Sequence, residues 1–120
     1  MIDRAFAERF AAEWVEAWNS HDLDRIFSHY SDDFEMSSPF IVELMGEASG
    51  KLKGKDAIRP YWTKGLAASP PLKFELERAF AGVDSITIAY RRTGPIRQAA
   101  EVLFFDKSRR VIRGVAHYGK

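Results

Sequence analysis

The chain has no cysteine, and its 120 residues carry almost no net charge. Without cysteine it has neither disulfides nor thiol chemistry, which favours a cytoplasmic protein. Its 18 basic and 17 acidic residues leave a formal charge of +1, so we expect no nucleic-acid or acidic-lipid partner. The apolar runs are far shorter than the ~20 residues that span a bilayer. The N-terminus lacks an apolar leader segment, so we expect no secretory signal and no membrane.

Two common kinds of ligand site are also missing from the sequence. The three histidines, at positions 21, 29 and 117, share no metal-ligand spacing, so we expect no metal site. The glycine- and lysine-rich segment 50–55 has no Walker pattern and follows no parallel strand, which argues against phosphate binding. No cofactor motif is present elsewhere. We therefore expect a single domain over residues 1–120 that functions without a cofactor.

The first half of the chain has the apolar spacing of helices. Over residues 3–19, bulky apolar side chains recur at steps of four, which predicts a helix lying on a core. Asn19 to Asp22 supplies cap residues for a second, short helix over about 22–30. A third helix is expected over 56–65, ending at a glycine.

The second half has the apolar alternation of strands. Phe34 to Met36 predicts a short strand that ends at Ser38-Pro39, and the segment 43–55 predicts an exposed loop. Short turns between the later strands indicate antiparallel neighbours. Three N-terminal helices followed by a meander predict an α+β fold, with the helices on one face of the sheet. The four later strands are expected over residues 72–80, 84–93, 97–106 and 110–118.

The segment 28–40, Ser-His-Tyr-Ser-Asp-Asp-Phe-Glu-Met-Ser-Ser-Pro-Phe, resembles part of a known fold. A helix end, a double aspartate, a short strand and Ser-Pro occur in this order in one superfamily. It comprises nuclear transport factor 2 (NTF2), the SnoaL-like polyketide cyclases and the ketosteroid isomerases. The resemblance implies a cone-shaped NTF2-like fold, in which a curved, mostly antiparallel sheet encloses a pocket.

Glu101 is the clearest candidate for chemistry. It is the only charged residue in the segment 99–105, which is apolar on both sides of the expected strand. Alternation places Glu101 on one face with Leu103. If helices cover that face, burial raises the pKa of the carboxyl. The alternative from the residues alone is an outward Glu101 that pairs with Arg91 or Arg92.

The family resemblance places Glu101 inside the pocket. The matching position in ketosteroid isomerases is an aspartate that donates a hydrogen bond to the substrate oxyanion, and that protonated acid is a known example of pKa tuning. Trp14 replaces the family's oxyanion tyrosine, and Ser38 replaces its general base. These two departures argue against steroid isomerisation.

His117 and Tyr118 are the next catalytic candidates, and only one of them can share a face with Glu101. A tight hairpin without a bulge places His117 there, and a His–Glu pair can relay a proton. One extra residue in the hairpin places Tyr118 there instead, where it would orient a polar ligand group.

We expect many aromatic and aliphatic side chains to line the pocket wall. Mostly apolar walls with a few polar groups are typical of small-molecule sites. The expected ligand-binding residues are Trp14, Trp18, Tyr30, Phe34, Tyr61, Trp62, Ile86, Ile88, Tyr90 and Leu103.

Two functions fit this pattern. The first is a SnoaL-like protein that binds a small apolar or ring-containing molecule and acts as an acid–base isomerase, cyclase or hydrolase. The second is a non-catalytic dimerising or ligand-sequestering module whose cavity is partly filled by its own aromatic residues. In either case we expect a homodimer, because apolar residues on the outer sheet face mark an interface. That face is expected to hold Thr87, Ala89, Val102 and Phe104.

Overall fold

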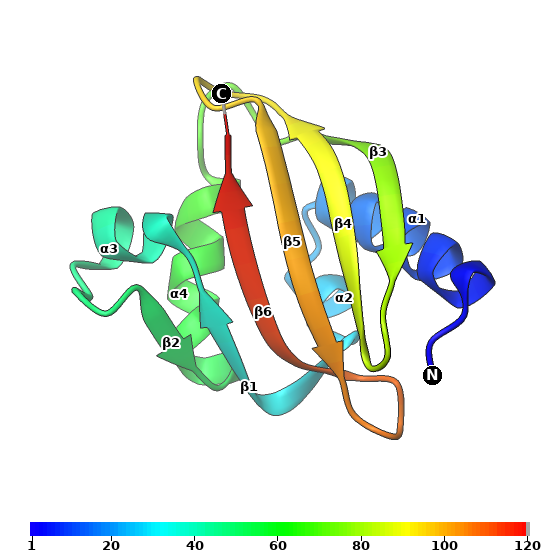
Figure 1. The fold of residues 1–120 in the computed structure, drawn as a ribbon. Helices are drawn as coiled ribbons and strands as arrows, with labels where there is room; N and C mark the ends of the chain where they lie inside the picture. The colour runs from blue at the N-terminus through cyan, green and yellow to red at the C-terminus, as the bar shows by residue number, and fades with distance from the viewer. Residues whose placement is uncertain (120) are drawn as a thin grey trace.

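The computed structural model describes residues 1–119 and has an α+β fold, in which helices cover one face of a curved six-stranded sheet (Figure 1). The strand order is β2-β1-β6-β5-β4-β3. β1 runs parallel to β6, and the other neighbouring pairs are antiparallel. The predicted fold class is therefore confirmed. The elements are α1 (Arg4–Ser20), α2 (Leu23–Phe27), β1 (Tyr30–Ser37), α3 (Pro39–Met45), β2 (Lys51–Lys53), α4 (Lys55–Leu66), β3 (Phe74–Ala81), β4 (Ser85–Arg92), β5 (Gln98–Phe105) and β6 (Val111–Tyr118).

The caps of α1 set where the helix begins and ends, and its apolar face sets how it packs on the sheet. The Asp3 carboxylate accepts a hydrogen bond from the Phe6 backbone N–H at 2.8 Å, which satisfies one free donor of the first turn. The helix ends at His21, whose φ of 59° is left-handed. Between these caps, Trp14 and Trp18 are buried against the sheet, where Trp14 stacks on Phe74 of β3 at a centroid distance of 5.4 Å.

The segment after β1 differs from the prediction. The sequence predicts that Ser38-Pro39 ends the strand and that a loop follows over 43–55, whereas the chain forms α3 and then β2. Ser38 is the N-cap of α3, since its Oγ accepts from the Phe40 backbone N–H at 3.2 Å. Pro39 occupies the first turn, where a missing N–H costs nothing. The described residues thus contain four helices rather than three.

The boundary between α2 and β1 also differs. The sequence predicts a helix over 22–30, but α2 ends at Phe27, and β1 begins at Tyr30 rather than at Phe34. The Val111 backbone N–H donates to the His29 carbonyl at 2.9 Å, and Tyr30 pairs with Val111. Pairing with a strand far along the sequence therefore overrides the local helical pattern.

One bulge fixes which side chains face inward at the end of β6. Phe104 pairs with Arg113 and Phe105 pairs with Val111, so Ile112 has no partner in β5. Beyond the bulge, Glu101 pairs with Ala116 and Ala99 pairs with Tyr118. Directly opposed residues share a face, so Tyr118 lies on the Glu101 face.

Within residues 1–119, none of the helices is both long enough and apolar enough to cross a membrane.

Candidate functional site

A cavity of about 220 Å³ lies between the inner face of the sheet and the helices. Its floor comes from β3 to β6, and its rim comes from α3, α4 and the segment after α4. The exposed residues Glu43, Leu44 and Lys64 are at the rim, so the cavity opens to solvent there. The lining residues are Trp18, Phe40, Glu43, Leu44, Trp62, Lys64, Gly65, Ala68, Leu72, Phe74, Tyr90, Arg92, Glu101 and Tyr118.

Glu101 is the buried acid of this cavity. It faces inward from β5 and is only 5% exposed. The Tyr90 hydroxyl donates a hydrogen bond to Glu101 Oε1 at 2.9 Å. Burial raises the pKa of Glu101 to about 7, although the hydrogen bond from Tyr90 and the positive charge of Arg92 both act to lower it. The carboxyl group is thus able to give or take a proton near neutral pH.

Tyrosine hydroxyl groups surround Glu101 and stay neutral. Burial raises the pKa of Tyr90, and the negative charge of Glu101 raises it further. The pKa of Tyr118 rises for the same two reasons. Burial also raises the pKa of Tyr61 to about 12, while its hydrogen bond to Ser38 at 3.0 Å opposes the shift. These hydroxyl groups are therefore hydrogen-bond donors rather than bases.

Two cations line the cavity, and Arg92 is the less exposed of them, since Lys64 is at the rim. Arg92 follows Tyr90 by two positions at the end of β4 and so points to the same inner face. Its guanidinium carbon lies 5.1 Å from the centre of the Phe40 ring and 5.3 Å from the centre of the Tyr118 ring. Within residues 1–119, Arg92 Nε is buried without a hydrogen-bond partner, as is Trp18 Nε1. The Nε–H of Arg92 thus remains available to an acceptor atom of a ligand.

The expected ligand-binding residues fall into two groups. Trp18, Trp62 and Tyr90 line the cavity. Trp62 also packs against Phe27, at a centroid distance of 4.7 Å, and it belongs to both wall and core. The other seven are buried in the core and do not line this cavity: Trp14, Tyr30, Phe34, Tyr61, Ile86, Ile88 and Leu103.

The two catalytic candidates at the end of β6 lie on opposite faces. Tyr118 lines the cavity with Glu101, as the bulged alternative predicts. His117 pairs with Ala100 on the outer face and is exposed. The alternative without a bulge is wrong, because Ile112 is the extra residue that reverses the alternation. His117 has no contact with Glu101 through which to relay a proton.

The outward alternative for Glu101 is also excluded, because its partner is Tyr90 on the inner face rather than an arginine. Sequence reasoning missed Arg92 and Phe40 as lining residues. The sequence does contain a signal for Arg92. The alternation that places Ile86, Ile88 and Tyr90 on one face of the strand also places Arg92 on that face. No comparable signal exists for Phe40, because the sequence pattern does not predict α3.

Within residues 1–119, no three His, Cys, Asp or Glu side chains are grouped so that they could hold a metal ion.

Comparison with known proteins identifies similar chains. The sequence model of the SnoaL-like domain matches residues 11–119. A SnoaL-like protein of unknown function from Burkholderia thailandensis is 50% identical, with a TM-score of 0.93. That match covers 99% of this chain and 98% of the other. No curated protein matches this chain.

More distant solved structures are similar in fold. The epoxide hydrolase/cyclase-like enzyme SalBIII, which has a role in pyran ring formation in polyether salinomycin, is 18% identical with a TM-score of 0.77. The match covers 99% of this chain and 95% of SalBIII. An NTF2-like protein of unknown function from Cytophaga hutchinsonii is 12% identical with a TM-score of 0.72, and the match covers 94% and 89% of the two chains. At these identities the likeness shows the fold alone.

Proposed function

Because the chain belongs to the SnoaL-like domain family, we propose that it binds a small, largely apolar molecule in the cavity beside Glu101 and exchanges a proton with it there. The observation that carries this proposal is a buried carboxyl group, with a pKa of about 7, on the wall of a cavity open to solvent. Such a group in an apolar site is typical of general acid–base catalysis. No cofactor is needed for this chemistry.

The size of the cavity limits the ligand. A dry cavity of ~150 Å³ is large enough to bind benzene. The cavity here, at about 220 Å³, is therefore large enough for one substituted ring or a short alkyl chain. Aromatic side chains of Trp18, Trp62 and Phe74 provide its apolar surface. The ligand that fits has an apolar body and at least one oxygen that accepts from the unpaired Nε–H of Arg92.

The reaction class follows from the protonation of Glu101. Protonated Glu101 gives its proton to a ligand oxygen as negative charge develops there, when a C–O bond or the π bond of a carbonyl group breaks. The carboxylate then takes a proton back from a C–H of the ligand in isomerisation, from the attacking hydroxyl in cyclisation, or from the attacking water in epoxide opening. The Tyr118 hydroxyl, on the same face, orients the same oxygen. Isomerisation, cyclisation and epoxide opening all use this transfer, and SalBIII, described as epoxide hydrolase/cyclase-like, has the same fold.

The first test is the titration of Glu101. We expect its carboxyl carbon to titrate near pH 7 in the NMR spectrum of the protein labelled at glutamate side chains, with Glu101→Gln identifying the resonance. The side-chain resonance of Glu8, which is exposed on α1, is the internal reference. A Glu101 pKa at or below that of free glutamate would remove the acid–base proposal.

The second test is ligand binding. A screen of small ring-containing and aliphatic compounds by thermal shift should find ligands that raise the melting temperature, because they bind only the native state. For any ligand that is also turned over, Glu101→Gln should lower the rate by about 10²–10⁴-fold, the usual contribution of an acid–base group. Glu8→Gln is the matched control and should retain the rate.

Binding without turnover is the second candidate function. The packing of seven expected wall residues into the core favours it, because the protein's own side chains fill much of the cone. A ligand that binds with equal affinity to wild type and Glu101→Gln, and that is recovered unchanged, would support sequestration over catalysis.

A further inference from the structure

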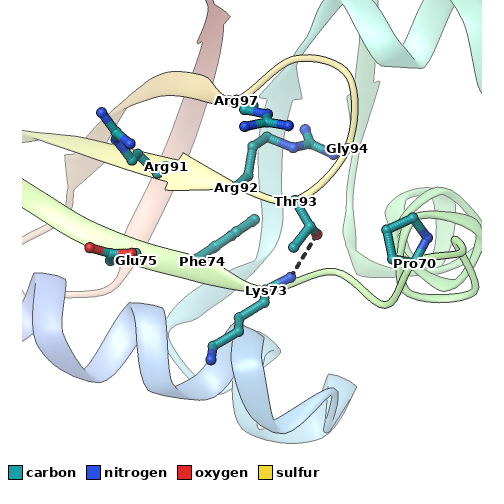
Figure 2. A pocket seen from close by; sticks show the side chains of 9 residues that line it. All are labelled: Pro70, Lys73, Phe74, Glu75, Arg91, Arg92, Thr93, Gly94 and Arg97. Atoms are coloured by element: carbon teal, nitrogen blue, oxygen red, sulfur yellow. Dashed lines mark hydrogen bonds between the residues drawn. The ribbon is translucent and has the colours of Figure 1, made fainter.

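The inner cavity adjoins a second, basic hollow at Arg92. This outer hollow has a volume of about 460 Å³ and shares Phe74 and Arg92 with the inner cavity. Figure 2 shows its residues coming from the segment before β3, the start of β3, the end of β4 and the turn that follows β4. Its other cations are Lys73, Arg91 and Arg97, and within residues 1–119 Glu75 is the only acidic residue that lines it. Arg92 therefore lies where an apolar cavity meets a positively charged hollow.

The guanidinium of Arg92 is held in place but not neutralised. The Phe40 and Tyr118 rings, with centroids 4.5 Å apart, both make cation–π contacts with it. None of the ion pairs found within residues 1–119 includes Arg92. By contrast, its neighbour Arg91 pairs with Glu77 at 3.2 Å. A fixed cation with an unpaired, buried Nε is suited to receive an anion.

From this arrangement we infer that Arg92 binds the carboxylate of the ligand, so that the ligand is a small carboxylic acid with an apolar ring or alkyl body. The inference rests on the proposed binding function and specifies its substrate class. A planar carboxylate matches the two parallel N–H groups of a guanidinium, which gives a short, charge-assisted contact. The apolar body then lies against Trp18, Trp62 and Phe74 in the inner cavity.

A monoanion fits this site better than a phosphate group does. Arg92 is the only arginine that lines the inner cavity within residues 1–119, where its partner must also sit close to apolar rings. A dianion would hold its second charge close to the apolar rings, because the other cations nearby are exposed. The more exposed cations of the outer hollow attract an approaching anion without specifying its shape.

Protonated Glu101 is compatible with a carboxylate nearby, whereas ionised Glu101 repels it. The inference therefore predicts weaker carboxylate binding as pH rises through about 7, where Glu101 loses its proton. The tyrosines near Glu101 stay neutral over this range, because burial raises their pKa values. The groups that face Glu101 or stand at the cavity rim are Tyr90 and Arg92 of β4, Tyr118 of β6, Tyr30 of β1, Tyr61 and Lys64 of α4, and Glu43 of α3.

The test compares acids with neutral isosteres of the same shape. Hydrocinnamate is compared with hydrocinnamide, and octanoate with octanamide, by calorimetric titration at pH 6 and pH 8. Wild type should bind an acid at least about tenfold more tightly than its amide at pH 6, since charge-assisted hydrogen bonds are about twice as strong as neutral ones. The preference should shrink at pH 8.

Variants assign the preference to Arg92. Arg92→Met keeps the length of the side chain and should lose the preference for the acid while still binding the amide. Arg92→Lys keeps the charge and should retain part of the preference. Arg78→Met is the matched control, because Arg78 is exposed on β3 and lines neither cavity. Circular dichroism of each variant checks that it is folded.

The outcomes separate this inference from the proposed function. If wild type binds amides as tightly as acids, ligand binding stands and the role of Arg92 is wrong. If folded Arg92→Met retains the full preference for the acid over the amide, the role assigned to Arg92 is also wrong. If neither member of either pair binds, both the proposed function and this inference fail.

Discussion

At the scale of single residues, Glu101 couples stability to pH. Its carboxyl group is 5% exposed, and burial raises its pKa from 4.5 to about 7 in the folded protein. The folded state therefore binds a proton more tightly than the unfolded chain does. The resulting stabilisation is fully present below pH 4.5 and is lost as pH rises through about 7. This direction is opposite to that of a carboxylate held in a salt bridge.

The first prediction at this scale concerns Glu101→Gln. The amide keeps the shape of the protonated acid, so the variant and wild type should have similar free energies of unfolding below pH 4.5. Above pH 7, wild type should become less stable than the variant by about 3 kcal/mol, which corresponds to the shift in pKa. Urea denaturation of both proteins across this pH range measures the difference in their free energies of unfolding. The contributions of the other titrating groups are common to both proteins and cancel in this difference. A difference that does not change with pH would mean that Glu101 is not buried in solution.

At the scale of elements, α3 depends on one buried serine. Ser38 is 3% exposed and accepts two hydrogen bonds: one from the Phe40 backbone N–H, which caps α3, and one from the Tyr61 hydroxyl of α4. The same side chain therefore begins one helix and ties it to another. Since Phe40 on α3 lies under Arg92, this link positions the rim of the cavity.

A prediction at this scale follows for Ser38→Ala. Loss of the cap should cost about 1 kcal/mol, and the unpaired Tyr61 hydroxyl should add about 1–3 kcal/mol. In a Tyr61→Phe background the same substitution should cost only the cap, because no hydroxyl is left unpaired. Denaturation of the four proteins of this double-mutant cycle measures both terms. Equal costs in the two backgrounds would show that the Tyr61 hydrogen bond contributes nothing.

At the scale of the whole molecule, one face of the sheet is uncovered. Figure 1 shows the helices behind the sheet, and its near face carries none of the helices of residues 1–119. The centre of this face is apolar, with arginines around it. Phe80 of β3 is 51% exposed and extends the apolar area of this face onto β3. Its half-buried apolar and small residues are Thr87, Ala89, Ala100, Val102, Phe104 and Val115.

We propose that a second copy of the chain covers this face as a twofold dimer, the commonest symmetric assembly. Sedimentation equilibrium at micromolar concentration should give the dimer mass for wild type. Val102→Glu places a charge at the centre of the face and should give the monomer. Val83→Glu is the matched control, since Val83 is 72% exposed in a turn away from the face, and it should remain dimeric. A monomer mass for wild type contradicts the proposal.

The parts that could be predicted from sequence are those with a strong local period. The apolar spacing of α1 and the alternation in β3 to β6 place these elements within a few residues of their observed bounds. α3 and β2 could not be predicted in this way, because Ser38-Pro39 fits a strand end as well as a helix start. For the site, alternation places Glu101 on an inner face only together with the family resemblance. Arg92 follows the same alternation, but its position at a strand end fits an exposed charge equally well.

The sequence by itself determined the α+β class and the apolar faces, because side-chain periodicity depends only on neighbouring residues. The tertiary structure alone decided which groups meet at the cavity. The unpaired Ile112 reverses the inward–outward alternation of side chains along β6. As a result Tyr118, rather than His117, lies on the face of Glu101. The contact of Arg92 with Phe40 joins segments about fifty residues apart. Such contacts depend on strand register and helix packing, which are set by long-range burial and hydrogen bonding rather than by local pattern.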